Sequence, residues 1–217
     1  MTINRKLWRA PIALLALGFL NIASGALQLS NIYQGPTPEI VASEVTNPHY
    51  FEVPVPVVVH IVGGGLFSLL VPLQFLTARH QNRIHRWTGR VLWCAGLVAA
   101  LSGLWMNQFF PAYGSGLKYA SVWAMGGTMT MALVLALRAV RNHNIGAHRA
   151  WMLRAVAMSL APAVQRLVLL PIFILTGSMS ILIIEIVVCG SFFLNLAVAE
   201  WAIRHGQINP PSTIPAE

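Results

Sequence analysis

Six predominantly apolar stretches, each about twenty residues long, follow one another along this 217-residue chain. As an α-helix, a stretch of this length spans the hydrocarbon core of a bilayer, which is about 30 Å thick. Only 9% of the residues are charged, whereas soluble domains contain about 25%. The sequence therefore predicts an all-α polytopic bundle of six transmembrane helices in one integral membrane domain, residues 1–217. The predicted spans are residues 10–29, 55–77, 91–110, 119–137, 155–175 and 181–203.

The first apolar stretch follows a basic segment, residues 4–9, and this order also occurs in secretory signal peptides. Residues 23–26 are small, as they are at a signal-peptide cleavage site. The stretch is nevertheless longer than the apolar region of a signal peptide, which contains about 7–15 residues. We therefore expect a retained first span, with removal of this segment as the alternative.

The positions of the basic residues predict the orientation of the helices. Of the 14 lysines and arginines, all except Lys118 and Arg166 lie near the two termini or in two loops, residues 79–90 and 138–154. Loops rich in Lys and Arg stay in the cytoplasm, so both termini and both loops are predicted to be cytoplasmic. The formal net charge of +8 is explained by this placement, and we expect no nucleic-acid partner.

The two cysteines, Cys94 and Cys189, each lie within an apolar stretch among small or apolar neighbours. Their spacing matches neither a disulfide framework nor a thiolate metal site. We expect both to be small buried packing residues.

The two basic loops share a short pattern, a His-x4-His-Arg sequence followed by a tryptophan. The first copy begins at His80 and ends at Trp87, and the second begins at His143 and ends at Trp151. A repeated pattern of this kind predicts that spans two and three form a hairpin related to the hairpin of spans four and five.

Several short motifs in the middle of the chain together resemble a family of bacterial predicted membrane proteins catalogued as domain of unknown function 2306. The motifs are His60, Gln74-Phe75, His85-Arg86-x-x-Gly89-Arg90 and His148-Arg149-x-Trp151-Met152. The resemblance covers about residues 55–166. It implies the multi-pass architecture and a place in the bacterial inner (cytoplasmic) membrane, but it implies no activity.

His85 and His148 are the first candidate site, because both precede spans that start on the same side of the membrane. Imidazole is the usual axial ligand of haem iron, and helical bundles place such ligands on facing helices. We therefore predict haem b held by these two residues, and Gly89 and Gly96 leave room for the ring edge. Four neighbouring arginines are candidates to neutralise the haem propionates: Arg86, Arg90, Arg149 and Arg154.

Two alternatives stay open for the same histidines. Together with His80 and His143 they form a set of imidazoles suited to Zn²⁺ or Cu²⁺. They also suit a loop that only contacts anionic lipid headgroups. If haem is bound, the protein is an electron-transfer protein whose partner is quinol or another membrane redox protein.

The second candidate site is an intramembrane polar cluster formed by His60, Gln74, Arg166 and Glu185. A charge inside the bilayer costs a few kcal/mol, so intramembrane ionisable residues indicate function. Arg166 and Glu185 lie on consecutive spans joined by a short turn, and we expect them to form an ion pair. The glycines at 63–65 allow either close helix packing or the approach of a cofactor.

This cluster leads to two other functional hypotheses. One is a proton-coupled carrier or small-ligand-binding membrane protein that uses His60, Arg166 and Glu185. The other is a structural or assembly subunit of a membrane complex, without chemistry of its own. The sequence alone does not decide whether the protein is an enzyme.

Overall fold

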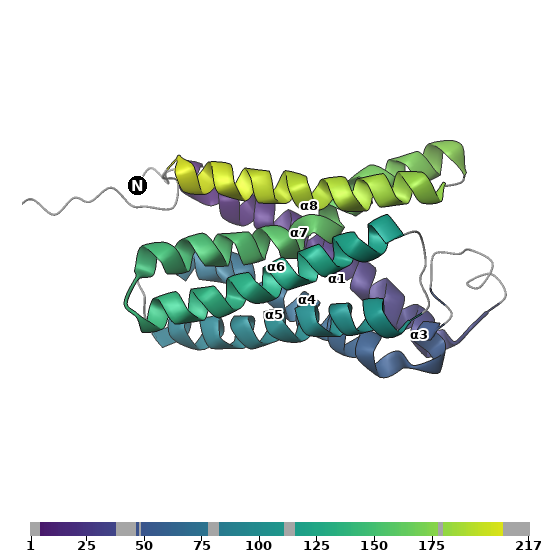
Figure 1. The fold of residues 1–217 in the computed structure, drawn as a ribbon, viewed down its shortest axis with the longest axis horizontal. Coiled ribbons are helices and arrows are strands. Elements are labelled where there is room, and N and C mark those ends of the chain that lie inside the picture. Colours follow the sequence, from purple (N-terminus) through teal and green to yellow (C-terminus); the bar gives the residue numbers. More distant parts are fainter. Residues whose placement is uncertain are drawn as a thin grey trace, which may run out of the picture.

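A computed structural model of the chain describes residues 5–37, 47, 49–77, 83–110, 116–177 and 180–205 (Figure 1). Within these residues it contains seven helices and no strand, and six of the helices are long and apolar enough to cross a membrane. The predicted all-α architecture with six spans is therefore confirmed. The helices are α1 (Arg5–Gln34), α3 (His49–Glu52), α4 (Pro54–Thr77), α5 (Arg83–Phe109), α6 (Gly116–Arg141), α7 (Ile145–Thr176) and α8 (Ile181–Arg204).

Local sequence signals explain where the helices of the second half begin and end. The side chain of Asn144 accepts a hydrogen bond from the backbone N–H of Ala147 at 2.9 Å and so caps the start of α7. Gly177 ends α7 in the left-handed conformation, with a φ of 69°, which costs glycine no steric penalty. Ser180 then caps α8. The turn between the two helices is short, so α7 and α8 run antiparallel.

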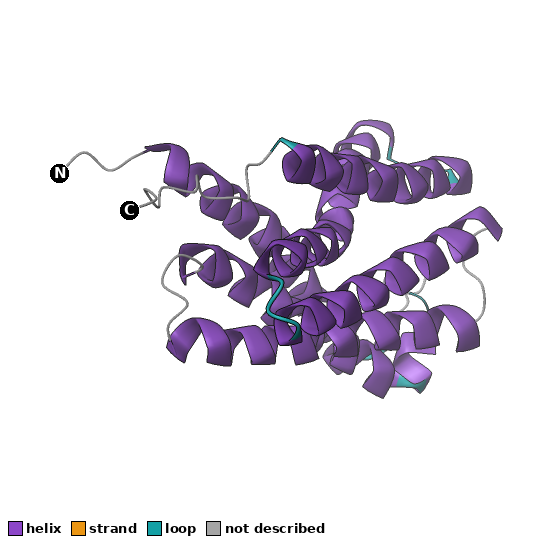
Figure 2. Cartoon of the chain, turned by 60° about the vertical axis from the view of Figure 1, so that its left-hand side comes forward, coloured by secondary structure: helices purple, strands orange, loops and turns teal. Residues whose placement is uncertain are grey.

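The helices pack as antiparallel neighbours, α4 against α5 and α6 against α7. Figure 2 shows the same helical bundle turned by 60° about the vertical axis. Helix α1 lies along α4 and also contacts α7, and α8 lies along α7. Lipid is as apolar as the helices, so close packing of small residues drives their association. The interior fits this principle, because five of its alanines are completely buried: Ala132, Ala136, Ala155, Ala161 and Ala163.

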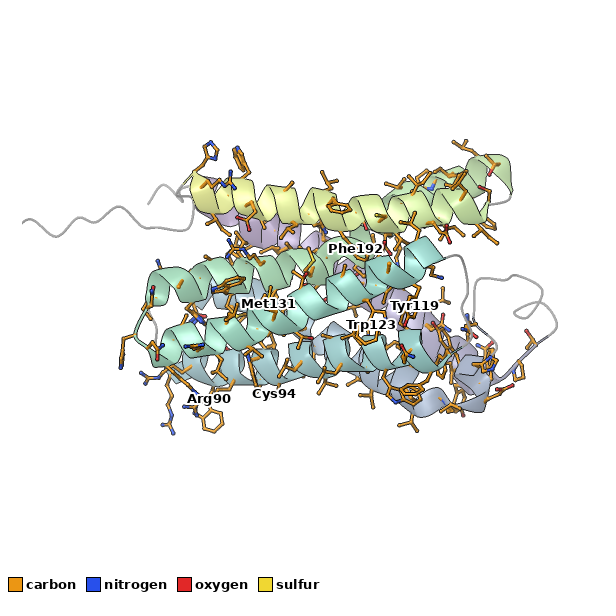
Figure 3. All side chains as sticks on the ribbon, viewed as in Figure 1. Arg90, Cys94, Tyr119, Trp123, Met131 and Phe192 are labelled. Carbon is orange, nitrogen blue, oxygen red and sulfur yellow. The ribbon has the colours of Figure 1, made fainter. Side chains whose placement is uncertain are left out.

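The outer surface of the bundle is apolar and meets the lipid. Phe19 and Phe193, for example, are each 71% exposed. Cys94 also lies on this surface, on α5, so the expectation that it is buried is wrong (Figure 3). Cys94 and Cys189 are both free.

One end of the bundle contains the start of α1, the end of α8 and the turn between α6 and α7 (Figure 1). We call it the basic end, because the two loops with the His-x4-His-Arg pattern belong to it. The opposite end, where α4 begins and α7 ends, is called the acidic end after the glutamates in residues 31–53. The cytoplasmic location of the basic end stays a prediction of the charge distribution.

Candidate functional site

A partly open cavity of about 150 Å³ lies between α1, α4, α5, α6 and α7. Most of its wall is apolar, with Phe67 and the three methionines Met125, Met129 and Met158 among the lining residues. Polar side chains come from three helices: Asn21 from α1, His60 and Ser68 from α4, and Ser159 and Arg166 from α7. The cavity is therefore an apolar chamber with a few converging polar groups, which is typical of small-molecule sites.

His60 enters the cavity from the acidic half of α4, about 9 Å from the start of that helix. Its Nδ1 lies 2.8 Å from the backbone oxygen of Ala99 on α5. A carbonyl oxygen only accepts, so Nδ1 carries the hydrogen and Nε2 of the neutral ring is an acceptor. Gly103 gives this ring its space, because a Cβ there would lie 3.0 Å from His60 Cε1.

Arg166 reaches the same cavity from α7 and is positioned by α1. Its Nη1 donates to Asn21 Oδ1 at 2.9 Å, and Asn21 Nδ2 donates to the backbone oxygen of Ser159 at 3.1 Å. The second bond fixes the orientation of the Asn21 amide, so its oxygen faces the guanidinium. Arg166 is also close enough to His60 for its charge to act on the imidazole.

The guanidinium of Arg166 has more donors than the cavity satisfies. Arginine has five N–H donors, and one of them is used in the bond to Asn21. Among the described residues that line the cavity, none is an aspartate or a glutamate. The cavity therefore presents a permanent positive charge and unused donors in an apolar surrounding.

The expected ion pair between Arg166 and Glu185 is not formed, so this prediction is wrong. Arg166 is bound to Asn21, whereas Glu185, which is 4% exposed, lies near enough to Lys118 of α6 for the two charges to interact. The two residues face different neighbours. Glu185 does not line the cavity.

Gln74 lies apart from the other members of the predicted polar cluster. It is fourteen residues after His60, which corresponds to about 21 Å along the helix. Its Nε2 donates to the backbone oxygen of His85 at 3.2 Å and to the hydroxyl of Thr88. Gly89 leaves room for this amide, because a Cβ there would lie 3.4 Å from Gln74 Oε1. Gln74 therefore joins α4 to α5 at the basic end.

His85 and His148 have equivalent positions in the two hairpins. His148 Nδ1 lies 2.9 Å from the backbone oxygen of Ala136 on α6, and His85 Nδ1 lies 3.1 Å from the hydroxyl of Thr77 on α4. Thr77 donates its only hydrogen to Leu73, so it accepts from His85. In each hairpin, the histidine near the start of the second helix is thus hydrogen-bonded through Nδ1 to the last part of the first helix.

His85 and His148 lie within electrostatic range of each other. The surroundings differ from those expected of a haem pocket in two respects. The space beside Gly96 is filled by the ring of Phe67, and that beside Gly89 by Gln74. The space expected for a cofactor edge is therefore occupied by Phe67 at Gly96 and borders Gln74 at Gly89.

The four arginines of the basic end have different environments. Arg86 and Arg90 are exposed, and Arg90 lies 5.4 Å from the ring centroid of Trp87 (Figure 3). Arg149 is half-buried and its charge acts on His85. Arg154 is already paired, since it binds both carboxylate oxygens of Glu200 and lies 4.4 Å from the ring centroid of Trp151.

The proposed set of four metal-binding histidines is described only in part. His80 lies outside the described residues, and His143 is exposed in the α6–α7 turn. Among the residues that the structure describes, no group of three or more His, Cys, Asp or Glu side chains is arranged to hold a metal ion.

Sequence reasoning missed the partners that complete the cavity. Asn21 is the one that matters most, because it positions Arg166. A signal for it was present, since Asn21 is a polar residue in the middle of an otherwise apolar stretch. Ser68 is the second, because it is only 6% exposed, lines the cavity, and its hydroxyl has no hydrogen-bond partner among the described residues.

Comparison with known proteins gives one match. A family model described as predicted membrane protein, DUF2306, matches residues 57–203, which include α5, α6 and α7 completely and nearly all of α4 and α8. The chain matches no curated protein and no solved structure. Helix α1, which supplies Asn21 to the cavity, precedes the matched residues.

Proposed function

The chain belongs to the DUF2306 family of predicted membrane proteins, and from this premise we propose that it binds a small ligand inside the bilayer, in the cavity of His60 and Arg166. The observation that supports this proposal is the guanidinium of Arg166, which enters an apolar cavity with four of its donors not bonded to any described residue. Inserting an arginine at this depth costs a few kcal/mol, and a bound ligand offsets that cost.

The neighbouring histidine suits the carrier version of this function. Nε2 of His60 is an acceptor to which no described residue donates a hydrogen bond, and imidazole gains or loses a proton near neutral pH. A proton-coupled carrier needs such a group next to its ligand. We place the protein in the bacterial inner membrane, to which the family resemblance points.

Filling the cavity tests the proposal. Gly65 lines the cavity, and an added Cβ there meets no atom within 4 Å, so the side chain of Gly65→Leu grows into the empty volume. We expect purified wild type to bind one molecule per chain of radiolabelled benzoate or benzyl alcohol. A cavity of about 150 Å³ is large enough for a benzene ring. Gly65→Leu should lose this binding.

The matched control is Gly127→Leu on α6. Gly127 is exposed and is equally open around its Cα, but it does not line the cavity. Both variants add a leucine to a helix, so they differ only in what the leucine fills. If neither compound binds to wild type, or if Gly65→Leu binds as well as Gly127→Leu, the proposal fails.

A second proposal assigns haem b to His85 and His148 at the basic end, with electron exchange to quinol or another membrane redox protein. It is supported by the equivalent positions of the two histidines in their hairpins and by the hydrogen bonds that both make through Nδ1. A ligating histidine usually donates its second ring nitrogen in this way, which fixes the ring and selects Nε2 for the metal.

A pyridine haemochrome assay tests this second proposal on protein made in haem-sufficient cells. We expect haem in wild type and its loss in both His85→Ala and His148→Ala, because each removes one axial ligand. His143→Ala, which changes an exposed histidine of the same end, serves as the control. A colourless wild-type protein, or haem retained in both ligand variants, would end the proposal.

A further inference from the structure

We infer that the ligand of the cavity is a small amphiphilic carboxylate, with one carboxylate group beside Arg166 and an apolar body of about the size of a benzene ring. The inference rests on the proposed ligand-binding function and adds the chemical class of the ligand. Three properties of the cavity support it: its charge, its polar groups and its volume.

The charge of the cavity favours a monoanion. Arg166 is protonated at all accessible pH values, and the described residues that line the cavity contain no acid to neutralise it. His60, bound to Ala99 through Nδ1, adds no second charge in its neutral form. One negative charge therefore balances the site, whereas a cation would be repelled and a dianion would be left with a surplus charge in an apolar surrounding.

The polar groups of the cavity suit a carboxylate in particular. A guanidinium binds the two oxygens of a carboxylate through two parallel hydrogen bonds, and Arg166 retains enough donors for this. Its orientation is fixed by Asn21, so little conformational freedom is lost when a ligand binds. The hydroxyl of Ser68, which lines the cavity and has no described partner, offers a further donor from α4.

The apolar part of the cavity limits the size of the ligand. A cavity of about 150 Å³ accepts a benzene-sized molecule. Phe67 and the three methionines form much of the wall, and methionine side chains adapt to ligands of irregular shape. Benzoate and hexanoate fit this description. Such an acid arrives either as a free solute or as a fatty acid already dissolved in the membrane.

Competition for radiolabelled benzoate on the detergent-purified protein tests the inference. Benzyl alcohol has nearly the same shape but no charge, so we expect it to bind at least about tenfold more weakly than benzoate. In Arg166→Gln, the affinity for benzoate should fall at least about tenfold, while the affinity for benzyl alcohol should stay the same. Unchanged binding of benzyl alcohol also shows that the variant is folded. Arg166→Lys should retain part of the preference, because it keeps the charge and loses the two-pronged geometry.

The outcomes separate this inference from the proposed function. If benzyl alcohol binds as tightly as benzoate to wild type, the carboxylate inference is overturned while the ligand-binding cavity stands. If Gly65→Leu still binds both compounds, both are overturned. Displacement of benzoate by hexanoate supports the inference, and if hexanoate does not displace benzoate the inference is overturned. The chain of palmitate is longer than the benzene-sized space, so palmitate should not displace benzoate, and displacement by palmitate would overturn the size limit.

Discussion

Replacing Gly63 by valine is expected to destabilise the protein by about 3 kcal/mol or more and to abolish ligand binding. A Cβ at this position would lie 3.0 Å from the backbone oxygen of Ala95 and 3.2 Å from the backbone nitrogen of Ala99. Both are backbone atoms of α5, and backbone atoms cannot rotate away as a side chain does. The backbone of α5 therefore has to give way, and the bond between His60 and Ala99 lies within one turn of the clash.

The change is measured as the melting temperature and as the fraction of monodisperse protein after purification in detergent. Gly65→Val is the control, because it adds the same side chain to the same helix where a Cβ meets no atom within 4 Å. Gly65→Val should fold, although it narrows the cavity. Wild-type stability in Gly63→Val would show that α4 and α5 do not approach each other as closely as described.

Breaking the ion pair between Arg154 and Glu200 is expected to cost about 2 kcal/mol. Arg154 donates through Nε at 2.6 Å and through Nη2 at 3.1 Å to the two carboxylate oxygens, and this joins α7 to α8. Loss of one partner of a fully buried pair costs about 3–5 kcal/mol. These side chains are 21% and 31% exposed, so solvent reduces the penalty.

A double-mutant cycle separates the pair from its surroundings. Arg154→Leu and Glu200→Leu should each lower the free energy of unfolding, measured by denaturing detergent titration, and the double variant should recover part of the loss because no unpaired charge remains. Arg138→Leu, which changes an exposed arginine of the same end, should have little effect. Additive losses in the double variant would mean that the two side chains act independently.

The sequence predicted the number and positions of the spans because hydropathy reports directly on contact with lipid. The helix ends were less accurate where a helix continues beyond the bilayer core. Helix α7 begins at Ile145, not near residue 155, because its basic first turns remain helical and Asn144 caps them. A hydropathy pattern marks the part of a helix that is in lipid, whereas the cap marks the part that is helical.

The site was predicted in part for a similar reason. Counting residues gives depth along a helix, and this correctly put His60 and Arg166 in the same half of the bundle. It gives no rotation about the axis, so Arg166 was assigned to Glu185 although its partner is Asn21 on α1. Gln74 and His60 share a face of α4, but they lie near opposite ends of this helix. Rotation depends on packing between distant helices, which one sequence does not reveal.

The bond between Asn21 and Arg166 has a consequence for how the protein is made. An arginine at the centre of a span costs about 2.5–3.5 kcal/mol when it leaves the translocon, and α7 contains such an arginine. Helix α1 precedes α7 in the chain, so it is already in the bilayer and offers a polar group when α7 arrives. We therefore expect α1 to complete its packing only when α7 inserts, although α7 is synthesised more than a hundred residues after α1.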